Sequence, residues 1–344
     1  MTLITYPTRV HFADDVVEEA LHSELERAGA KHPLLIGPAE LDDTEARERV
    51  LAGFPRFARP ECYSLKPTTG FAEAMRSLHQ KAETEAIDAI VAFGSARSLT
   101  LGQKCRAELS DATGKRLPLH VIPNIDGLPD PGTLRLETWR NALPDVVICD
   151  PTMADGAGGA AHLRALIVSF VRCLEAYLAP TYNPVADGLA LDGIQRCVDI
   201  IPKLVTGKGE DLRRETMVAT LNAAMSQEKG PGPTQQIVAA LSDVCPDLDQ
   251  AAALRLVLPG ALTLRPADPK KRQAVLRIIG RKGATLDEAV GGFLAQLPLP
   301  NALAALGIGA DDLTRATTIA ETRFGLSAAR LSDMLMPLWQ AVPA

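Results

Sequence analysis

The sequence predicts two parts: an N-terminal α/β domain built on a mostly parallel sheet, and an all-helical C-terminal domain. In the first half, short aliphatic and β-branched runs alternate with helical patterns, which is the order expected of a parallel sheet covered by helices. In the second half strand patterns are almost absent, and helical stretches are separated by proline and glycine. A chain of 344 residues is long enough for two domains.

The first half contains six predicted strands, namely Arg9–Phe12, Pro33–Ile36, Glu61–Ser64, Ile87–Phe93, Leu117–Ile122 and Val146–Cys149. The helices predicted between them are Val16–Ala28, Asp43–Ala52, Gly70–Glu83 and Ser98–Glu108. Turn-forming residues follow several of these strands, at Gly37-Pro38, Thr68–Gly70, Gly94-Ser95 and Asn124–Gly127. Because parallel sheets bind ligands at the carboxyl ends of their strands, we expect these turns to line one crevice.

The domain boundary is predicted within Asp150–Gly159, where one proline and three glycines interrupt regular structure. The predicted domains are therefore residues 1–157 and 158–344. The helices predicted in the second domain are Gly159–Leu178, Pro184–Val205, Glu210–Gln227, Thr234–Leu241, Leu248–Leu264, Lys270–Arg281, Thr285–Ala295, Asn301–Leu306, Ala310–Phe324 and Ala328–Ala341. The predicted helix Leu248–Leu264 is apolar nearly all round except at Arg255, which predicts a buried central helix.

Composition excludes some classes of partner. The net charge of −6 argues against a nucleic-acid or anionic-membrane surface, since both require clustered positive charge. No apolar run approaches the ~20 residues that cross a bilayer. The segment Met1–Tyr6 lacks the basic and apolar regions of a signal peptide, and it is predicted to be an edge strand. Six scattered cysteines indicate reduced thiols and a cytoplasmic protein. A homodimer is left open.

Several short segments along the chain, in this order, carry a likeness to one known family. They are Thr8–Phe12, Ala28–Lys31, Leu143–Pro151, Leu174–Tyr177, Asn183-Pro184 with Asp187, Val257–Pro259 and Leu297–Pro300. Together these segments resemble the iron-containing (group III) alcohol dehydrogenases, including the maleylacetate reductase branch. The resemblance spans most of the chain. It implies a dehydroquinate synthase-like architecture, with a Rossmann-like N-terminal domain, a helical metal domain and a ligand site in the cleft between them.

The metal ligands of that family, usually one aspartate and three histidines, are not matched. The resemblance places the aspartate on Val168, the first histidine on Arg172 and the last on or near Gln250. The remaining ligand belongs in Met225–Gln236, which contains no histidine, and no histidine follows His162. An aliphatic side chain and a guanidinium do not ligate divalent ions. We therefore expect no metal.

The family's glycine triplet and serine, which hold the cofactor pyrophosphate, correspond to the turn Gly94–Arg97. A strand, a small-residue turn and a helix N-terminus form a generic anion cradle. Arg97 either pairs with a phosphate or fills the space that a phosphate would take. The family's cofactor-packing loop corresponds to Pro123–Asp130. The residues expected to bind NAD or NADP are Gly37, Gly94, Ser95, Ala96, Arg97, Asn124 and Asp126.

Two cations are candidates for chemistry. Arg172 replaces a metal ligand and could clamp a carboxylate or stabilise an oxyanion; the simpler alternative is that it pairs with Glu175 or Asp187 and fills a vacated space. Lys229, near the missing third ligand, is a candidate acid–base residue, with a solvated loop lysine as the alternative.

The resemblance therefore implies an NAD(P)-dependent oxidoreductase without a metal, acting on a small carbonyl or alcohol substrate in the interdomain cleft. The alternative is a non-catalytic homologue that retains the scaffold as a binding or interaction module. A different reaction in the same cleft, of the lyase or synthase type, also stays open.

Overall fold

A computed structural model describes residues 8–124, 143–154, 158–207, 212–281 and 284–340. The predicted edge strand Met1–Tyr6 and the candidate residue Asp126 lie outside these ranges. The chain divides into two compact units, Leu3–Gly158 and Gly159–Ala344, with Met1–Thr2 grouped with the second. The first is an α/β unit and the second is a helical unit.

The α/β unit contains a six-stranded parallel sheet with the order β1-β6-β5-β4-β2-β3. Its strands are β1 (Arg9–Phe12), β2 (Pro33–Pro38), β3 (Glu61–Leu65), β4 (Ala89–Gly94), β5 (Leu119–Pro123) and β6 (Val146–Cys149). The strands β2, β4, β5 and β6 are buried along their whole length. Continuous aliphatic runs form such strands because both faces of the sheet are covered. All six predicted strands are confirmed.

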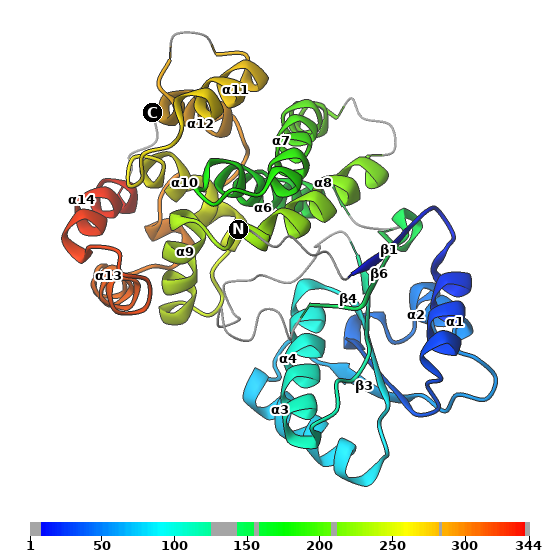
Figure 1. The fold of residues 1–344 in the computed structure, drawn as a ribbon. Helices are drawn as coiled ribbons and strands as arrows, with labels where there is room; N and C mark the ends of the chain where they lie inside the picture. Colours follow the sequence, from blue (N-terminus) through cyan, green and yellow to red (C-terminus); the bar gives the residue numbers. More distant parts are fainter. Residues whose placement is uncertain (1–7, 125–142, 155–157, 208–211, 282–283, 341–344) are drawn as a thin grey trace. The chain divides into compact units, whose positions relative to one another are not determined.

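Helices cover both faces of this sheet, with α3 (Phe71–Thr84) and α4 (Ala96–Thr113) on one face and α1 (Val17–Ala28) and α2 (Glu45–Ala52) on the other (Figure 1). The predicted helix Ser98–Glu108 was too short. α4 begins at Ala96 because Gly94 turns the chain with φ +93 and Ser95 is extended. It continues to Thr113 because the left-handed C-cap lies only at Gly114.

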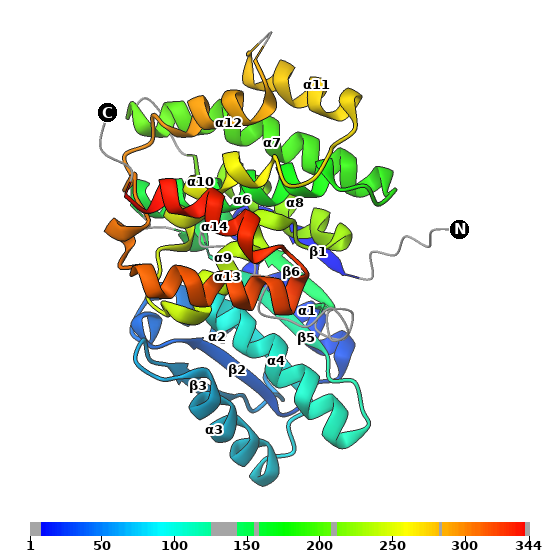
Figure 2. The same cartoon turned by 90° about the vertical axis from the view of Figure 1, so that its left-hand side faces the viewer.

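The helical unit is centred on α6, which packs against α7, α8 and α10. Its helices are α6 (Gly159–Leu178), α7 (Pro184–Val205), α8 (Arg213–Ser226), α9 (Pro233–Val244), α10 (Gln250–Ala261), α11 (Pro269–Ile279), α12 (Leu286–Leu294), α13 (Ala310–Phe324) and α14 (Ala328–Trp339). Figure 2 shows α13 and α14 lying side by side, in agreement with their packing contacts. α6 and α7 approach closely at Gly193, where an added Cβ would lie 2.4 Å from the Cys173 sulfur.

Two predictions for this unit have opposite outcomes. The predicted helix Asn301–Leu306 is wrong, because only a short 3-10 turn, η5 (Ala304–Leu306), forms after Pro300 and before the left-handed Gly307. The predicted central helix is confirmed as α10, and Arg255 is buried within it. Its guanidinium donates to the carbonyls of Leu294, Leu299 and Pro300. Arg255 therefore anchors the segment that leads from α12 toward η5.

Candidate functional site

The order in which the strands are added to the sheet reverses between β2 and β4. The connection from β2 leads through α2 to β3 at one edge, whereas the connection from β4 leads through α4 to β5 on the other side. Open parallel sheets bind ligands at the carboxyl ends of the strands that flank such a reversal. The strand ends in question are Gly37-Pro38 and Gly94-Ser95. The topology therefore selects two of the predicted cofactor turns, and we call this position the switch point.

Gly94 and Pro38 pack against each other at the switch point. Gly94 has φ +93, and a Cβ built on it would lie 2.8 Å from Pro38 Cδ. A residue other than glycine would therefore meet both backbone strain and a clash with the proline ring. On Gly37, a Cβ would lie 2.0 Å from the ring of Phe93. These glycines let neighbouring strand ends and the Phe93 ring approach each other closely.

Helix α4 begins directly at the switch point. Ser95 is its N-cap residue, and the Ser95 side chain makes no capping hydrogen bond. The first backbone amides of a helix, here those of Ala96, Arg97 and Ser98, have no acceptor within the helix. A Cβ on Gly102 would lie 2.6 Å from the Ala92 Cβ, so α4 packs tightly on β4. The helix N-terminus is thus fixed with its amides at the carboxyl edge, a geometry that fits a phosphate group.

Arg97 engages protein groups. Its guanidinium donates to the carbonyls of Lys66 and Pro67, both at 2.9 Å, and to the carbonyl of Thr69. Its cationic carbon also lies 5.7 Å from the centroid of the Phe71 ring. Arg97 therefore holds the loop between β3 and α3. The two predicted roles, phosphate pairing and space filling, did not include these contacts.

Among the other predicted cofactor residues, Asn124 follows β5, and its backbone amide donates to the carbonyl of Gly94 at 3.0 Å. The structure therefore brings Asn124 to the switch point together with Gly94, Ser95 and Ala96.

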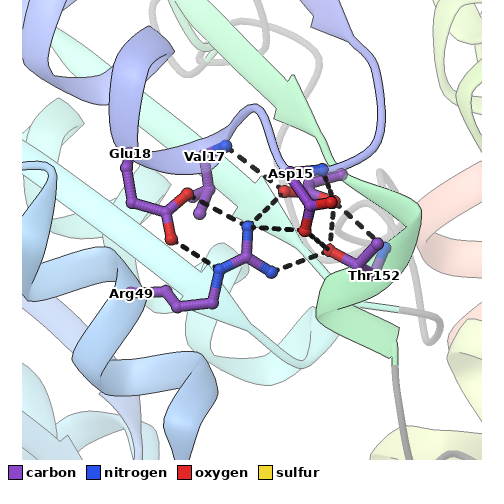
Figure 3. Close-up of polar contacts among 6 residues, drawn as sticks. Asp15, Val17, Glu18, Arg49 and Thr152 are labelled. Carbon is purple, nitrogen blue, oxygen red and sulfur yellow. Dashed lines mark hydrogen bonds and ion pairs between the residues drawn. The ribbon is translucent and has the colours of Figure 1, made fainter.

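A buried polar network lies at the carboxyl end of β6 (Figure 3). The Asp150 carboxylate is fully buried and accepts hydrogen bonds from the amides of Asp15 and Val17 at the start of α1. It also accepts from Thr152 and, at 2.9 Å, from the guanidinium of Arg49. Burial raises the pKa of Asp150, but these hydrogen bonds outweigh it and the pKa is lowered overall. Sequence reasoning missed this network, because Arg49 and Asp150 are 101 positions apart.

The α6 helix carries Val168 and Arg172, the two positions at which the resemblance predicted metal ligands. Val168, Arg172 and Glu175 follow the i, i+4, i+7 spacing of one helix face. Val168 is partly buried and Arg172 is 6% exposed. The backbone carbonyl of Arg172 accepts a hydrogen bond of 3.2 Å from Gln227 Nε2. Neither side chain fits a divalent ion, because valine offers no donor atom and a guanidinium offers no lone pair.

Glu175 has its own partners on the same helix face. Its carboxylate accepts hydrogen bonds from the backbone amides of Thr234 at 2.6 Å and Gln235 at 3.3 Å, in the first turn of α9. The Gln235 side chain donates a further one at 3.1 Å. Burial raises the pKa of Glu175, and these hydrogen bonds partly offset the rise. Glu175 thus acts as the cap of α9.

Lys229 lies in a buried ion pair with Asp187. Its side chain is fully buried, which rules out the solvated loop lysine. The amine donates to Asp187 Oδ1 at 2.6 Å and to the carbonyl of Ala179 at 3.1 Å. Lys271 occupies the other carboxylate oxygen of Asp187, at 2.8 Å, and donates to the carbonyl of Tyr177. Burial lowers the pKa of Lys229, while Asp187 acts in the opposite direction.

The described ranges contain no group of three or more His, Cys, Asp or Glu side chains arranged to hold a metal ion. His162, in the first turn of α6, is buried, and its Nδ1 lies 3.2 Å from the hydroxyl of Thr216. None of the helices in the described residues is both long enough and apolar enough to span a bilayer. All six cysteines are free thiols.

Comparison with known proteins gave no matching family model. Among curated proteins, the chain is 25% identical over 350 residues to 4-hydroxybutyrate dehydrogenase from Cupriavidus necator, covering 90% of this chain and 91% of the relative. It is also 25% identical over 241 residues to maleylacetate reductase from Rhizobium sp. (strain MTP-10005), covering 68% of this chain and 67% of that protein.

Solved structures with the same fold include a maleylacetate reductase from Agrobacterium tumefaciens, with a TM-score of 0.79 and 20% identity over 100% of this chain and 99% of that one. An iron-containing alcohol dehydrogenase from Corynebacterium glutamicum superposes with a TM-score of 0.77 and 19% identity over 98% of both chains. The sulfoacetaldehyde reductase from Bifidobacterium kashiwanohense, in complex with NAD+, gives 0.79 and 14% identity over 99% of this chain and 100% of that one. The predicted architecture is thereby confirmed.

Proposed function

We propose that this chain, whose homologues and structural neighbours are iron-containing alcohol dehydrogenases and maleylacetate reductases, is an oxidoreductase that uses NAD(H) or NADP(H) without a metal ion. The observation that supports the reaction type best is the likeness to 4-hydroxybutyrate dehydrogenase along 90% of the chain. A fold alone would not establish a function. Here a sequence relationship and the preserved switch point support the same reading.

The cofactor site we propose is the switch point of the α/β unit. The amides at the start of α4 would bind the pyrophosphate, and Gly94 adds no side chain of its own beside the Pro38 ring. Asn124, held by the carbonyl of Gly94, would border the same position. A bound nicotinamide supplies or accepts the hydride. The protein's contribution at this unit is therefore binding and orientation.

The substrate we propose is a small carbonyl compound, or the corresponding alcohol, that carries a carboxylate. The names of both curated relatives denote acids of this kind, 4-hydroxybutyrate and maleylacetate. Arg172 supplies a permanent positive charge on α6, at a position where the resemblance predicted a metal ligand. A guanidinium can pair with a carboxylate through two hydrogen bonds, or stabilise a developing oxyanion. Arg172 would do one of these in place of an ion.

The first test is binding. Titration of the purified protein with NADH and with NADPH, followed by the melting temperature, is expected to show stabilisation by at least one of them. Turnover of 4-hydroxybutyrate and of its aldehyde is then measured before and after treatment with a chelator. The proposal expects unchanged turnover after chelation. Turnover that disappears and returns with added iron or zinc would overturn the metal-free mechanism.

A second test concerns Arg172. Arg172→Leu is expected to lower kcat/KM for carboxylate substrates by about 100-fold, as for loss of a charged hydrogen-bonding group in an active site. Arg172→Lys is the matched control, since it keeps the charge but loses the planar fork. A neutral aldehyde without a carboxylate separates carboxylate pairing from oxyanion stabilisation. If Arg172 stabilises the oxyanion, Arg172→Leu lowers kcat/KM for this aldehyde too; if Arg172 only pairs with the carboxylate, kcat/KM for the aldehyde is unchanged.

The second candidate is a non-catalytic homologue, and it is favoured by the replacement of ligand positions at Val168 and Arg172. It is supported further by Lys229, whose buried amine is already paired with Asp187. This reading predicts that neither dinucleotide raises the melting temperature and that no acid–aldehyde is reduced. The titration described above therefore separates the two candidates directly.

A further inference from the structure

The guanidinium of Arg97 holds one loop through three carbonyl groups. Its acceptors are the carbonyls of Lys66, Pro67 and Thr69, which all belong to the connection between β3 and α3. The loop is itself turned, because the amide of Thr69 donates to the carbonyl of Lys66 at 3.1 Å. This turn places several carbonyls around one side chain. A planar group with five N–H donors suits such an arrangement.

A second contact fixes the same region. The ring of Phe71, the first residue of α3, has the Arg97 guanidinium 5.7 Å and the Lys104 amine 4.9 Å from its centroid. Both cations come from α4, and α3 packs directly on α4. A cation over an aromatic face is attracted by the ring's quadrupole. The first turn of α3 and the preceding loop are therefore tied to the first turns of α4.

The contacts between Arg97 and loop 66–70 lie beside the switch point. β2 lies between β4 and β3 in the sheet, so the start of α4 and the loop after β3 flank the carboxyl end of β2. That strand end, at Pro38, is one side of the switch point. The loop 66–70 is thus a border of the site where we propose that a dinucleotide binds.

We propose that Arg97 is a positioning residue: it closes loop 66–70 against the start of α4 and so preforms one wall of the dinucleotide site. This inference rests on the function proposed above. Preformed walls raise affinity because less conformational freedom is lost on binding. The inference replaces the expectation that Arg97 contacts phosphate directly, since its two terminal nitrogens already donate to carbonyl oxygens.

Three variants test this assignment. Arg97→Ala removes the side chain's hydrogen bonds, and Arg97→Lys keeps the charge but replaces the fork by a single ammonium group. Arg76→Ala, at an exposed position of α3, is the control for loss of one positive charge. Amide hydrogen exchange across residues 66–71 is measured without ligand. Dissociation constants are then measured for NADH, NADPH, ADP and adenosine, with the melting temperature recorded to confirm that each variant folds.

The expected result is faster amide hydrogen exchange across residues 66–71 in both Arg97 variants. Affinity for NADH and NADPH should fall about tenfold in Arg97→Ala and nearly as far in Arg97→Lys, because the fork rather than the charge is needed. Arg76→Ala should leave the exchange and the affinity unchanged.

Two outcomes would overturn the positioning role while leaving the proposed function intact. The first is unchanged exchange together with a selective loss of ADP over adenosine binding, which would show direct phosphate contact. The second is dinucleotide binding that Arg97→Ala does not alter. A wild-type protein that binds neither dinucleotide would instead overturn the proposed function.

Discussion

The amine of Lys229 lies 2.6 Å from Oδ1 of Asp187, and the lysine side chain has no exposed surface. Asp187 is shared with Lys271, and both amines also donate to backbone carbonyls at the end of α6. Cations near a helix C-terminus are favoured by the helix dipole. This arrangement joins α6, the start of α7, the loop before α9 and α11 at one carboxylate.

Asp187→Leu should therefore destabilise the helical unit strongly. It leaves two amines without their anion, one of them fully buried, and loss of one partner of a buried pair costs about 3 kcal/mol or more. Lys229→Met should cost about 1 kcal/mol, because Asp187 keeps Lys271 and a desolvated charge is removed. Urea unfolding measures both, with the exposed Asp199→Asn of α7 as the control. Equal effects of the two changes would contradict this assignment.

Gly94→Ala should lower both stability and dinucleotide affinity. Gly94 combines φ +93 with a Cβ position only 2.8 Å from the ring of Pro38. Gly114→Ala is a matched control, because Gly114 also has a positive φ, +66, but nothing lies within 4 Å of its Cβ position. The control should cost about 1 kcal/mol from backbone strain alone, and Gly94→Ala about 1–3 kcal/mol more from overpacking. Similar losses in thermal unfolding would show that the Pro38 contact is unimportant.

Glu24 should make the α/β unit sensitive to acid. Arg9 binds its carboxylate at 2.6 Å and His11 at 2.9 Å, and these partners lower the pKa of Glu24 from 4.5 to about 2. The folded state therefore binds fewer protons than the unfolded state between these values. The stabilisation, on the order of 2 kcal/mol, is present above pH 4.5 and is lost as the pH falls toward 2. Glu24→Gln should flatten this part of the stability profile measured by chemical unfolding.

Asp150→Ala should destabilise the α/β unit far more than Glu18→Ala, although both carboxylates bind Arg49. Asp150 is fully buried and also caps the amides of Asp15 and Val17, so its removal should cost about 3 kcal/mol. Glu18 has 36% of its side chain exposed, and its loss should cost under about 1 kcal/mol. Guanidinium unfolding with reversed magnitudes would show that Glu18, not Asp150, supports the network.

Divalent metals should not stabilise the folded protein. Iron(II) or zinc at concentrations that saturate a metal-dependent relative should leave the melting temperature unchanged, since Val168 and Arg172 supply no ligand. A chelator should have no effect for the same reason. Elemental analysis of the purified protein provides the independent measurement, and a stoichiometric metal ion would contradict the expectation.

Hydrophobic patterning predicted the four inner strands β2, β4, β5 and β6, because strands buried on both faces consist of mainly aliphatic runs. The limits of α4 were less predictable. Its start depends on the backbone angle of Gly94 and its end on the left-handed Gly114, and neither conformation follows from residue type alone. The backbone φ angles in the structure show which of the glycines lie at the ends of an element.

The turns of the candidate site were predictable from the sequence, but the contacts of its side chains were not. Turn residues after strands located Gly37 and Gly94 correctly at adjoining strand ends. The roles of Arg97 and Lys229 could not be foreseen, because their partners are set by tertiary packing. Thr69 lies 28 positions from Arg97, and Asp187 lies 42 positions from Lys229. A proline- and glycine-rich loop suggested solvent around Lys229, whereas helix packing enclosed it.

The close approach of α6 and α7 at Gly193 also bears on protein engineering. The sulfur of Cys173 lies where a side chain at position 193 would be, so this contact restrains sliding of α6 along α7. The register of α6 on α7 is therefore fixed by a close contact between a side chain and a helix backbone. Aspartate at position 168 and histidine at position 172 would place two candidate ligands four residues apart on α6 without altering that contact.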